Sequence, residues 1–129
     1  MTGRIESAAE VRPKAGEYVS GDAAFAVELD DGVLGVIVDV LGHGEEANAL
    51  AVRIEAYVRE NPSGYVVALM SRLHEAFRGS RGAAVGLCAV EAATGKLRYA
   101  GIGNTVIRRF GESDMRLVSR DGVVGGIMR

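Results

Sequence analysis

The stretch DAAFAVELDDGVLGVIVDV, residues 22–40, constrains the fold more than any other part of the sequence. Its first half alternates between apolar and other side chains, which is the pattern of a half-buried β-strand. Asp31-Gly32 follows, and an Asp-Gly pair between two apolar segments is a strong signal for a two-residue hairpin turn. The sequence therefore predicts an antiparallel hairpin with strands over Asp22 to Asp30 and Val33 to Asp39.

This predicted hairpin brings two carboxylates together. With Asp31-Gly32 as the turn, Ala24 lies opposite Asp39. Side chains alternate with period two, so Asp22 shares the face of Ala24 and becomes a diagonal neighbour of Asp39, roughly 5–8 Å away. The opposite face of the hairpin is apolar, and it pairs Phe25 with Val38, Val27 with Val36 and Leu29 with Leu34. A pair of acids is thus predicted at one end of a hairpin that otherwise belongs to a core.

The rest of the chain predicts two helices and then further strands. Apolar residues at helical spacing mark a helix that begins after Gly44 and ends at residues 61–64, which read Asn-Pro-Ser-Gly. A second helix is predicted over Tyr65 to Arg78. The predicted strands that follow cover Ala83 to Ala92, Lys96 to Ile102, Thr105 to Phe110 and Met115 to Ser119. Because the helices are segregated from antiparallel strands, the predicted class is α+β with a layered architecture.

Composition and charge narrow the possible functions. The 129 residues suffice for one domain, and 48% apolar with 25% charged residues is ordinary for a globular protein. The net charge is −2 with acids and bases mixed, so we expect neither nucleic acid nor a membrane as partner. No segment is long enough to span a bilayer, and the first residues lack a signal-peptide pattern. The single cysteine, Cys88, excludes a disulfide framework and indicates a reducing, cytoplasmic environment; we interpret it as a core residue.

The two acids suggest a metal site. Carboxylates at one end of a strand pair repel each other, and a hard divalent cation such as Mg²⁺ or Mn²⁺ relieves this because it prefers oxygen ligands. Gly42 and Gly44 let the backbone turn sharply beside Asp39, and the helix after them directs its amide-rich N-terminus to the same region, which favours phosphate. The alternative is that Asp39 is a turn or N-cap residue, as a single acid at a strand end usually is.

Two motifs at this spacing resemble a known protein family. SGDAAF, Ser20 to Phe25, is followed by VDVLGHG, Val38 to Gly44, and the pair resembles the metal-dependent PPM family of serine/threonine protein phosphatases. The bacterial sigma-regulator branch, of the RsbX and SpoIIE type, carries SGD, a hairpin and a DGLGHG-like motif. RGAAVGLCAVEAATGKLRYAGIGN, Arg81 to Asn104, resembles the next block of that family, which ends in GxGN. The resemblance covers essentially the whole chain.

The resemblance implies an antiparallel β-sandwich flanked by α-helices, with two Mn²⁺ or Mg²⁺ ions at one end. By this comparison Asp39 is the metal-bridging carboxylate and Asp22 is a second acid of the metal site, and both act in catalysis through metal-bound water. In the family a glycine follows the bridging acid and donates its backbone carbonyl to a metal, and here that position is Val40. We expect the Cβ of Val40 to restrict the backbone and to crowd the site.

The sequence departs from the family at its C-terminal end as well. Family members continue with another strand pair that carries further acidic ligands, whereas this sequence stops at Arg129. We therefore expect a single phosphatase-like domain over residues 1–129 that lacks the C-terminal strands. Residues 119–122, Ser-Arg-Asp-Gly, resemble the missing ligand motif only superficially, so we assign Asp121 to a glycine-rich loop.

Three functions are compatible with these observations. The first is metal-assisted hydrolysis of phosphoserine or phosphothreonine, with His43 either a general acid or a residue that shapes the loop. The resemblance implies phosphorylated partners in bacterial stress signalling, such as STAS-domain proteins of the stressosome. The second function is a catalytically weak or inactive phosphatase-like module that binds such partners. The third is an unrelated α+β binding domain whose acids cap turns. Arg81 is interpreted as an exposed loop charge.

Overall fold

The computed structural model describes residues 4–111 and 114–126 and contains two helices and six strands within them. The strands are β1 (Asp22–Leu29), β2 (Gly32–Val40), β3 (Ala83–Glu91), β4 (Leu97–Ile102), β5 (Val106–Arg109) and β6 (Met115–Val118). The helices are α1 (Gly44–Glu60) and α2 (Val66–Ala76), which confirms the predicted order of hairpin, two helices and further strands. No helix of the described part is long and apolar enough to cross a membrane.

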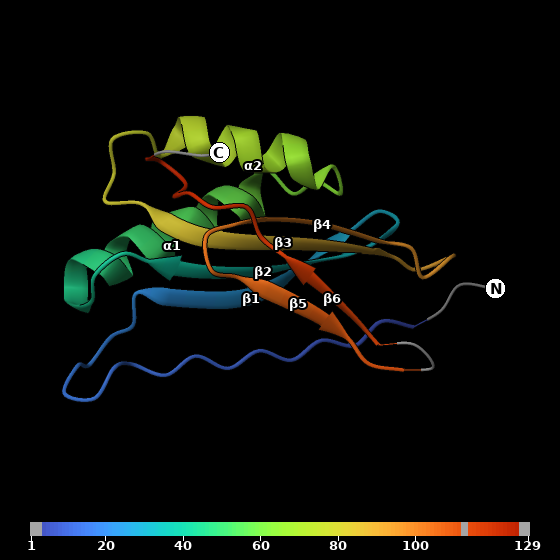
Figure 1. Ribbon diagram of the computed structural model, residues 1–129, viewed down its shortest axis with the longest axis horizontal. Helices are drawn as coiled ribbons and strands as arrows, with labels where there is room; N and C mark the ends of the chain where they lie inside the picture. Colours follow the sequence, from blue (N-terminus) through green and yellow to red (C-terminus); the bar gives the residue numbers. More distant parts are fainter. Residues whose placement is uncertain (1–3, 112–113, 127–129) are drawn as a thin grey trace.

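The strands form two sheets. β1, β2, β3 and β4 make one antiparallel sheet in that order, and β5 and β6 make a separate two-stranded sheet. Both helices lie on one face of the larger sheet, α1 against β1 and β2 and α2 against β3 and β4 (Figure 1). The β5–β6 hairpin lies on the other face (Figure 1). These layers confirm the predicted α+β class, with antiparallel strands flanked by helices.

The core lies between the helices and the larger sheet. Every second residue of β2 is buried on this side, namely Leu34, Val36, Val38 and Val40. The helices meet them with apolar stripes that include Leu50, Ile54 and Val58 of α1 and Leu69, Met70 and Leu73 of α2. Since burial of such a side chain stabilises the fold by about 1.5–3 kcal/mol, this strip of contacts fixes β2 firmly in place.

The hairpin register differs from the prediction by two residues. Asp22 lies directly opposite Asp39, and the turn is made by Asp30 and Asp31 rather than by Asp31-Gly32. A shift of two residues keeps every side chain on its predicted face, whereas a shift of one would have reversed the faces. The apolar pairs become Phe25 with Val36, Val27 with Leu34 and Leu29 with Gly32.

Gly32 explains the change, because it belongs to two strand pairs. It lies opposite Leu29 of β1 and opposite Glu91 of β3. A Cβ at this position would overlap the carbonyl oxygen of Val90, so glycine is needed for the close approach of two backbones. Every described residue with a positive φ is a glycine, and Gly32 is not among these glycines. The primed turn that an Asp-Gly pair favours is therefore not formed.

A group of three hydroxyls fastens the β5–β6 hairpin to the larger sheet. Tyr99 Oη lies 2.9 Å from Thr105 Oγ1 and 2.6 Å from Ser119 Oγ, and Ser119 Oγ donates to the Thr105 carbonyl oxygen at 2.6 Å. Beside this group, an open cavity of about 590 Å³ separates the two sheets, and small residues form much of its wall: Ala24, Ala26, Gly35, Gly86 and Cys88. The hairpin thus covers its face of the larger sheet only in part.

Candidate metal-binding site

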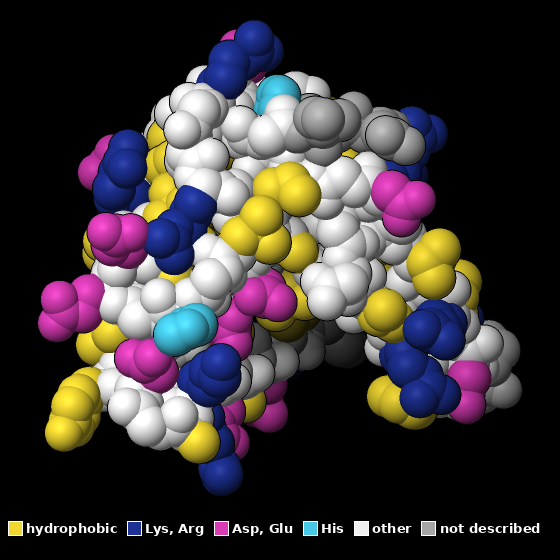
Figure 2. All heavy atoms as spheres, turned by 60° about the vertical axis from the view of Figure 1, so that its left-hand side comes forward, with side chains coloured by type: hydrophobic (Ala, Val, Ile, Leu, Met, Phe, Trp, Pro, Cys, Tyr) yellow, Lys and Arg dark blue, Asp and Glu magenta, His cyan; other side chains and the backbone are white. Residues whose placement is uncertain are grey.

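Asp22 and Asp39 lie directly opposite each other where β1 begins and β2 nears its end. Directly opposed residues of an antiparallel pair have Cβ atoms about 4.5–5.5 Å apart, closer than the diagonal arrangement that we predicted. Both acids are exposed, on the opposite face from the buried Val38 and Val40. Figure 2 brings forward the end of the molecule at which β1 begins and β2 ends. It shows a hollow between the β5–β6 hairpin and the rest of the molecule.

The electrostatics of this pair favour a cation. Partial burial raises the pKa of Asp39 above its ordinary value of 3.8, and the Asp22 carboxyl raises it further through hydrogen bonding and charge. Both effects disfavour the state in which the two carboxylates are ionised together. A divalent cation bound to them would favour that ionised state, because it supplies the opposite charge at short range.

The segment that leads into β1 is held by α1. The Asp22 N–H donates to Ser20 Oγ at 2.9 Å, and Asn48 Nδ2 of α1 donates to the Ser20 carbonyl oxygen at 2.9 Å. A Cβ on Gly21 would lie 2.9 Å from the Cβ of Ala47, so glycine lets this segment approach the helix closely. Asn48 is absent from the sequence-based candidates. In the sequence Asn48 is a polar residue between the apolar positions of a helix face, and in the structure its side chain is half-buried.

The loop after Asp39 turns sharply at two glycines, as predicted. Gly42 and Gly44 have φ values of +90° and +84°, in the region that favours glycine. His43, between them, is the N-cap residue of α1, with an extended backbone and no side-chain capping hydrogen bond. The first turn of α1 carries Glu45 and Glu46, where the helix dipole favours acids.

The side chain of Val40 lies on the opposite face of β2 from Asp39, which argues against the crowding that we expected. Its side chain is 1% exposed and packs in the core, because alternation along β2 turns it to the opposite face from Asp39. Its N–H donates to the Gly21 carbonyl oxygen at 2.9 Å, and its φ is not positive. Its own carbonyl oxygen lies 3.7 Å from where a Cβ of Gly21 would be. The oxygen therefore lies beside the segment before Asp22, as does the Gly42 carbonyl oxygen at the same distance.

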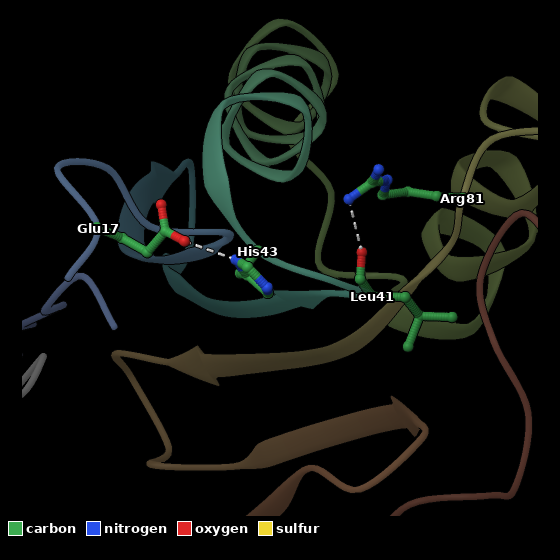
Figure 3. Close-up of polar contacts among 4 residues, drawn as sticks. All are labelled: Glu17, Leu41, His43 and Arg81. Carbon is green, nitrogen blue, oxygen red and sulfur yellow. Dashed lines mark hydrogen bonds and ion pairs between the residues drawn. The ribbon is translucent and has the colours of Figure 1, made fainter. Parts of the chain in front are cut away.

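His43 turns toward Glu17 (Figure 3). Its Nδ1 lies 2.7 Å from Glu17 Oε1, and its side chain is 58% exposed. Among the described residues no hydrogen bond joins His43 to Asp22 or to Asp39. The structure thus gives His43 a carboxylate partner outside the acid pair, and Glu17 is a second residue that the sequence did not single out.

Cys88 lies in the middle of β3, opposite Gly35 of β2 and Tyr99 of β4. Burial raises the pKa of its thiol above the ordinary value of 9.0. The thiolate that a cysteine nucleophile requires is therefore disfavoured. Cys88 is nevertheless half-buried and lines the cavity between the two sheets, outside the core between the helices and the larger sheet, so the interpretation of Cys88 as a core residue was wrong.

The oxygen donors at the site are two carboxylates and one backbone carbonyl, from Asp22, Asp39 and Val40. Within residues 4–111 and 114–126, no group of three or more His, Cys, Asp or Glu side chains could hold a metal ion. Hard oxygen donors of this kind suit Mg²⁺ and Mn²⁺, and Mg²⁺ commonly keeps several water ligands. The residues present therefore fit part of such an ion's coordination, with water completing it.

Comparison with known proteins identifies the fold. The sequence matches no protein-family model and no curated protein. A structure solved for "The bacterial stressosome: a modular system that has been adapted to control secondary messenger signaling" aligns over 89% of this chain with 27% identity and a TM-score of 0.81. RsbX in complex with magnesium aligns over 92% with 24% identity and a TM-score of 0.78. The SiaA-PP2C domain of Pseudomonas aeruginosa aligns over 83% with 23% identity and a TM-score of 0.70. The chain has the fold of a PP2C/PPM-type phosphatase domain.

The chain spans only part of the proteins that it resembles. It covers 60% of the stressosome protein, 61% of RsbX and 47% of the SiaA-PP2C chain. What is shared is the fold, over 83–92% of this chain.

The first prediction concerns Val40. Because its side chain is buried, Val40→Gly should lower the free energy of unfolding by about 2–4 kcal/mol, through lost burial and a glycine in a strand. Mn²⁺ affinity should not rise. Val38→Gly, which removes the same side chain two residues earlier, is the matched control, and urea unfolding with Mn²⁺ titration measures both variants. Tighter Mn²⁺ binding by Val40→Gly alone would mean that this side chain does crowd the site.

The second prediction concerns the pH dependence of stability without metal. The pKa of Asp39 is higher in the folded protein than the ordinary value of 3.8 that applies to the unfolded chain. As the pH rises above 3.8, the folded protein therefore keeps the proton on Asp39 while the unfolded chain releases it. The contribution of Asp39 to stability is therefore lost as pH rises through the interval between these two pKa values. Asp39→Asn should stabilise the metal-free protein at pH 7 by about 0.5 kcal/mol, within the usual range for an opposed cross-strand pair.

Urea unfolding at pH 7 and below pH 3.8 checks this prediction, since the advantage of Asp39→Asn should disappear where the wild-type carboxyl is protonated. Asp30→Asn, which changes an exposed acid of the β1–β2 turn, serves as control and should show no such pH-dependent gain. An Asp39→Asn protein that is less stable than wild type at pH 7 would contradict the account of the acid pair.

Proposed function

We propose that this chain belongs to a metal-dependent serine/threonine protein phosphatase that acts in bacterial stress signalling. The observation that carries the proposal is the direct opposition of Asp22 and Asp39 at the rim of a PP2C/PPM-type fold. The raised pKa of Asp39 supports it, because two acids that disfavour joint ionisation are what a divalent cation stabilises. RsbX, which shares the fold, was solved in complex with magnesium. In this proposal residues 1–129 belong to one phosphatase-like domain.

Each donor has a role in the proposed site. Asp39 and Asp22 hold Mn²⁺ or Mg²⁺, with two ions in the full site, and the backbone carbonyl of Val40 is a further ligand. When bound, such ions activate water for attack on phosphorus and stabilise charge on the phosphate oxygens. The chain contributes rigidity, because both acids stand on adjacent strands of one sheet and the Val40 N–H is hydrogen-bonded to Gly21. Ligands held this way are preorganised for binding.

His43 is the residue that we propose as proton donor to the departing serine or threonine oxygen. Its exposed ring lies on the loop that follows Asp39, and Glu17 Oε1, 2.7 Å from Nδ1, orients the imidazole. The Nε2 atom is then the position that would carry the transferred proton. A protein nucleophile is not needed in this chemistry, in keeping with the raised pKa of Cys88.

The proposed pathway rests on the proteins that share the fold. One of the similar structures comes from the bacterial stressosome, and another is RsbX. We propose that the substrates are phosphorylated cytoplasmic proteins, including STAS-domain proteins of a stressosome or a sigma-regulator pathway. The shared fold argues against an unrelated binding domain whose acids only cap turns.

A catalytically weak or inactive binding module is the second candidate function. One observation favours it: only two acidic side chains converge at the site within the described residues. Such a module would bind phosphorylated partners without hydrolysing them.

The third prediction separates these two candidates. Mn²⁺-dependent hydrolysis of p-nitrophenyl phosphate and of a phosphoserine peptide should fall by about 100-fold or more in Asp39→Asn and in Asp22→Asn. The expected loss is this large because removal of a residue that only hydrogen-bonds to a metal ligand already costs about 10–100-fold. Asp30→Asn should retain wild-type activity, and circular dichroism should confirm that all three variants are folded.

The possible outcomes distinguish the candidate functions. Wild-type protein that binds Mn²⁺ without hydrolysing either substrate would favour the binding module. Activity that persists undiminished in Asp39→Asn would show that the metal site is elsewhere.

A further inference from the structure

Arg81 joins the loop after β2 to the first turn of α1. Its Nη1 donates to the Leu41 carbonyl oxygen at 3.2 Å, and its Nη2 lies 2.7 Å from Glu46 Oε2 (Figure 3 shows the contact with Leu41). The side chain of Arg81 is 34% exposed, whereas that of Glu46 is 86% exposed. Arg81 is thus the exposed loop charge expected from the sequence, and in addition its side chain bridges the loop after β2 and the first turn of α1.

The guanidinium replaces a backbone donor at the point where the β2–β3 ladder ends. The Leu41 N–H donates to the Gly82 carbonyl oxygen at 2.9 Å. In an antiparallel ladder the reciprocal bond would run from the Gly82 N–H to the Leu41 carbonyl oxygen. Here the Gly82 N–H is directed to Ser80 Oγ at 3.3 Å, and Arg81 Nη1 occupies the Leu41 oxygen instead. Both polar groups of the Leu41 backbone are thus held by residues 81 and 82.

Gly42 completes this arrangement. A Cβ on Gly42 would lie 2.5 Å from Arg81 Nη1, so the guanidinium packs directly against the glycine backbone. The φ of Gly42 is +90°, a value that a side chain would also disfavour. The loop between Val40 and α1 therefore has one conformation in which glycine, guanidinium and Glu46 fit together.

We propose that Arg81 is a positioning residue of the acid site, and that together with Glu46 it holds the Leu41–Gly44 loop so that the Val40 carbonyl and Asp39 keep the geometry needed to bind a divalent cation. Arginine suits this role better than lysine because its planar fork donates in two directions at once, here to a carbonyl and to a carboxylate. The inference rests on the proposed function for its metal-binding half. The claim that Arg81 orders the Leu41–Gly44 loop depends only on the contacts described above.

The experiment compares Arg81→Gln, Arg81→Lys and Glu46→Gln with the control Arg78→Gln. Arg78 forms an exposed ion pair with Glu75 at 2.5 Å, and within the described residues it has no hydrogen bond or ion pair with the Leu41–Gly44 loop. Arg78→Gln therefore removes the same charge as Arg81→Gln without touching the loop. Two measurements are made on the full chain: amide hydrogen exchange of residues 41–46 in metal-free protein, and Mn²⁺ affinity by calorimetry. Melting temperature without metal confirms that each variant is folded.

Arg81→Gln should accelerate exchange in residues 41–46 several-fold. It should also weaken Mn²⁺ binding by about 10–100-fold, the usual cost of losing a residue that holds metal ligands in place without binding the metal. Arg81→Lys and Glu46→Gln should produce smaller changes in the same direction. The double variant Arg81→Gln/Glu46→Gln should not exceed Arg81→Gln, because Glu46 acts through Arg81. Arg78→Gln should match wild type in both measurements.

Unchanged loop exchange in Arg81→Gln would overturn the proposal. So would accelerated exchange with wild-type Mn²⁺ affinity, because Arg81 would then order the loop without affecting the site. A wild-type protein that binds no Mn²⁺ would instead overturn the phosphatase proposal and the metal-binding half of this one. In that case the exchange measurement still decides whether Arg81 holds the loop, so the two failures are distinguishable.

Discussion

The pairing of β1 with β2 is the constraint on which the rest of the structure depends, because its register sets Asp22 opposite Asp39. Partial burial raises the pKa of Asp39, and the neighbouring Asp22 carboxyl raises it further, so joint ionisation of the two acids is disfavoured. The register is nevertheless fixed, since a slip by one residue would expose the buried face of β2 and carry the acids into the core. Core packing therefore stabilises an arrangement that is electrostatically unfavourable without a cation. A strained pair of this kind is typical of a functional site.

Three hydrogen bonds hold the segments on either side of Asp22 and Asp39 in place. Asn48 of α1 holds the Ser20 carbonyl, the Val40 N–H is bonded to Gly21, and Arg81 holds the Leu41 carbonyl. Each contact joins a loop to a different part of the chain: helix α1, strand β2 and the segment that precedes β3. The loops that flank the acids are thus tied to rigid parts of the fold, which is how a site keeps its ligand geometry.

Much of the fold follows from local sequence patterns, whereas the contacts that shape the site do not. Alternation and helical spacing predicted the hairpin, both helices and the later strands, because these periodicities depend on neighbours along the chain. The register failed at Gly32, whose role is set by close approach to Val90 on a distant strand. The direction of the Val40 side chain was missed for a related reason, since the family resemblance identifies the residue at a position but not the face to which its side chain points. Arg81 was missed because its partners lie 35 and 40 residues away.

The central claim is that a divalent cation binds between Asp22 and Asp39, and the most direct test is paramagnetic broadening of backbone amide NMR signals by substoichiometric Mn²⁺. The account predicts that the earliest and strongest losses fall on amides around Gly21 and Asp39, including those of Ala23 and Val40. A second acidic region at the opposite end of the hairpin, formed by Glu28, Asp30, Asp31 and Glu91, provides an internal comparison. Losses that appear first in that region, or evenly over all acidic residues, would contradict the account.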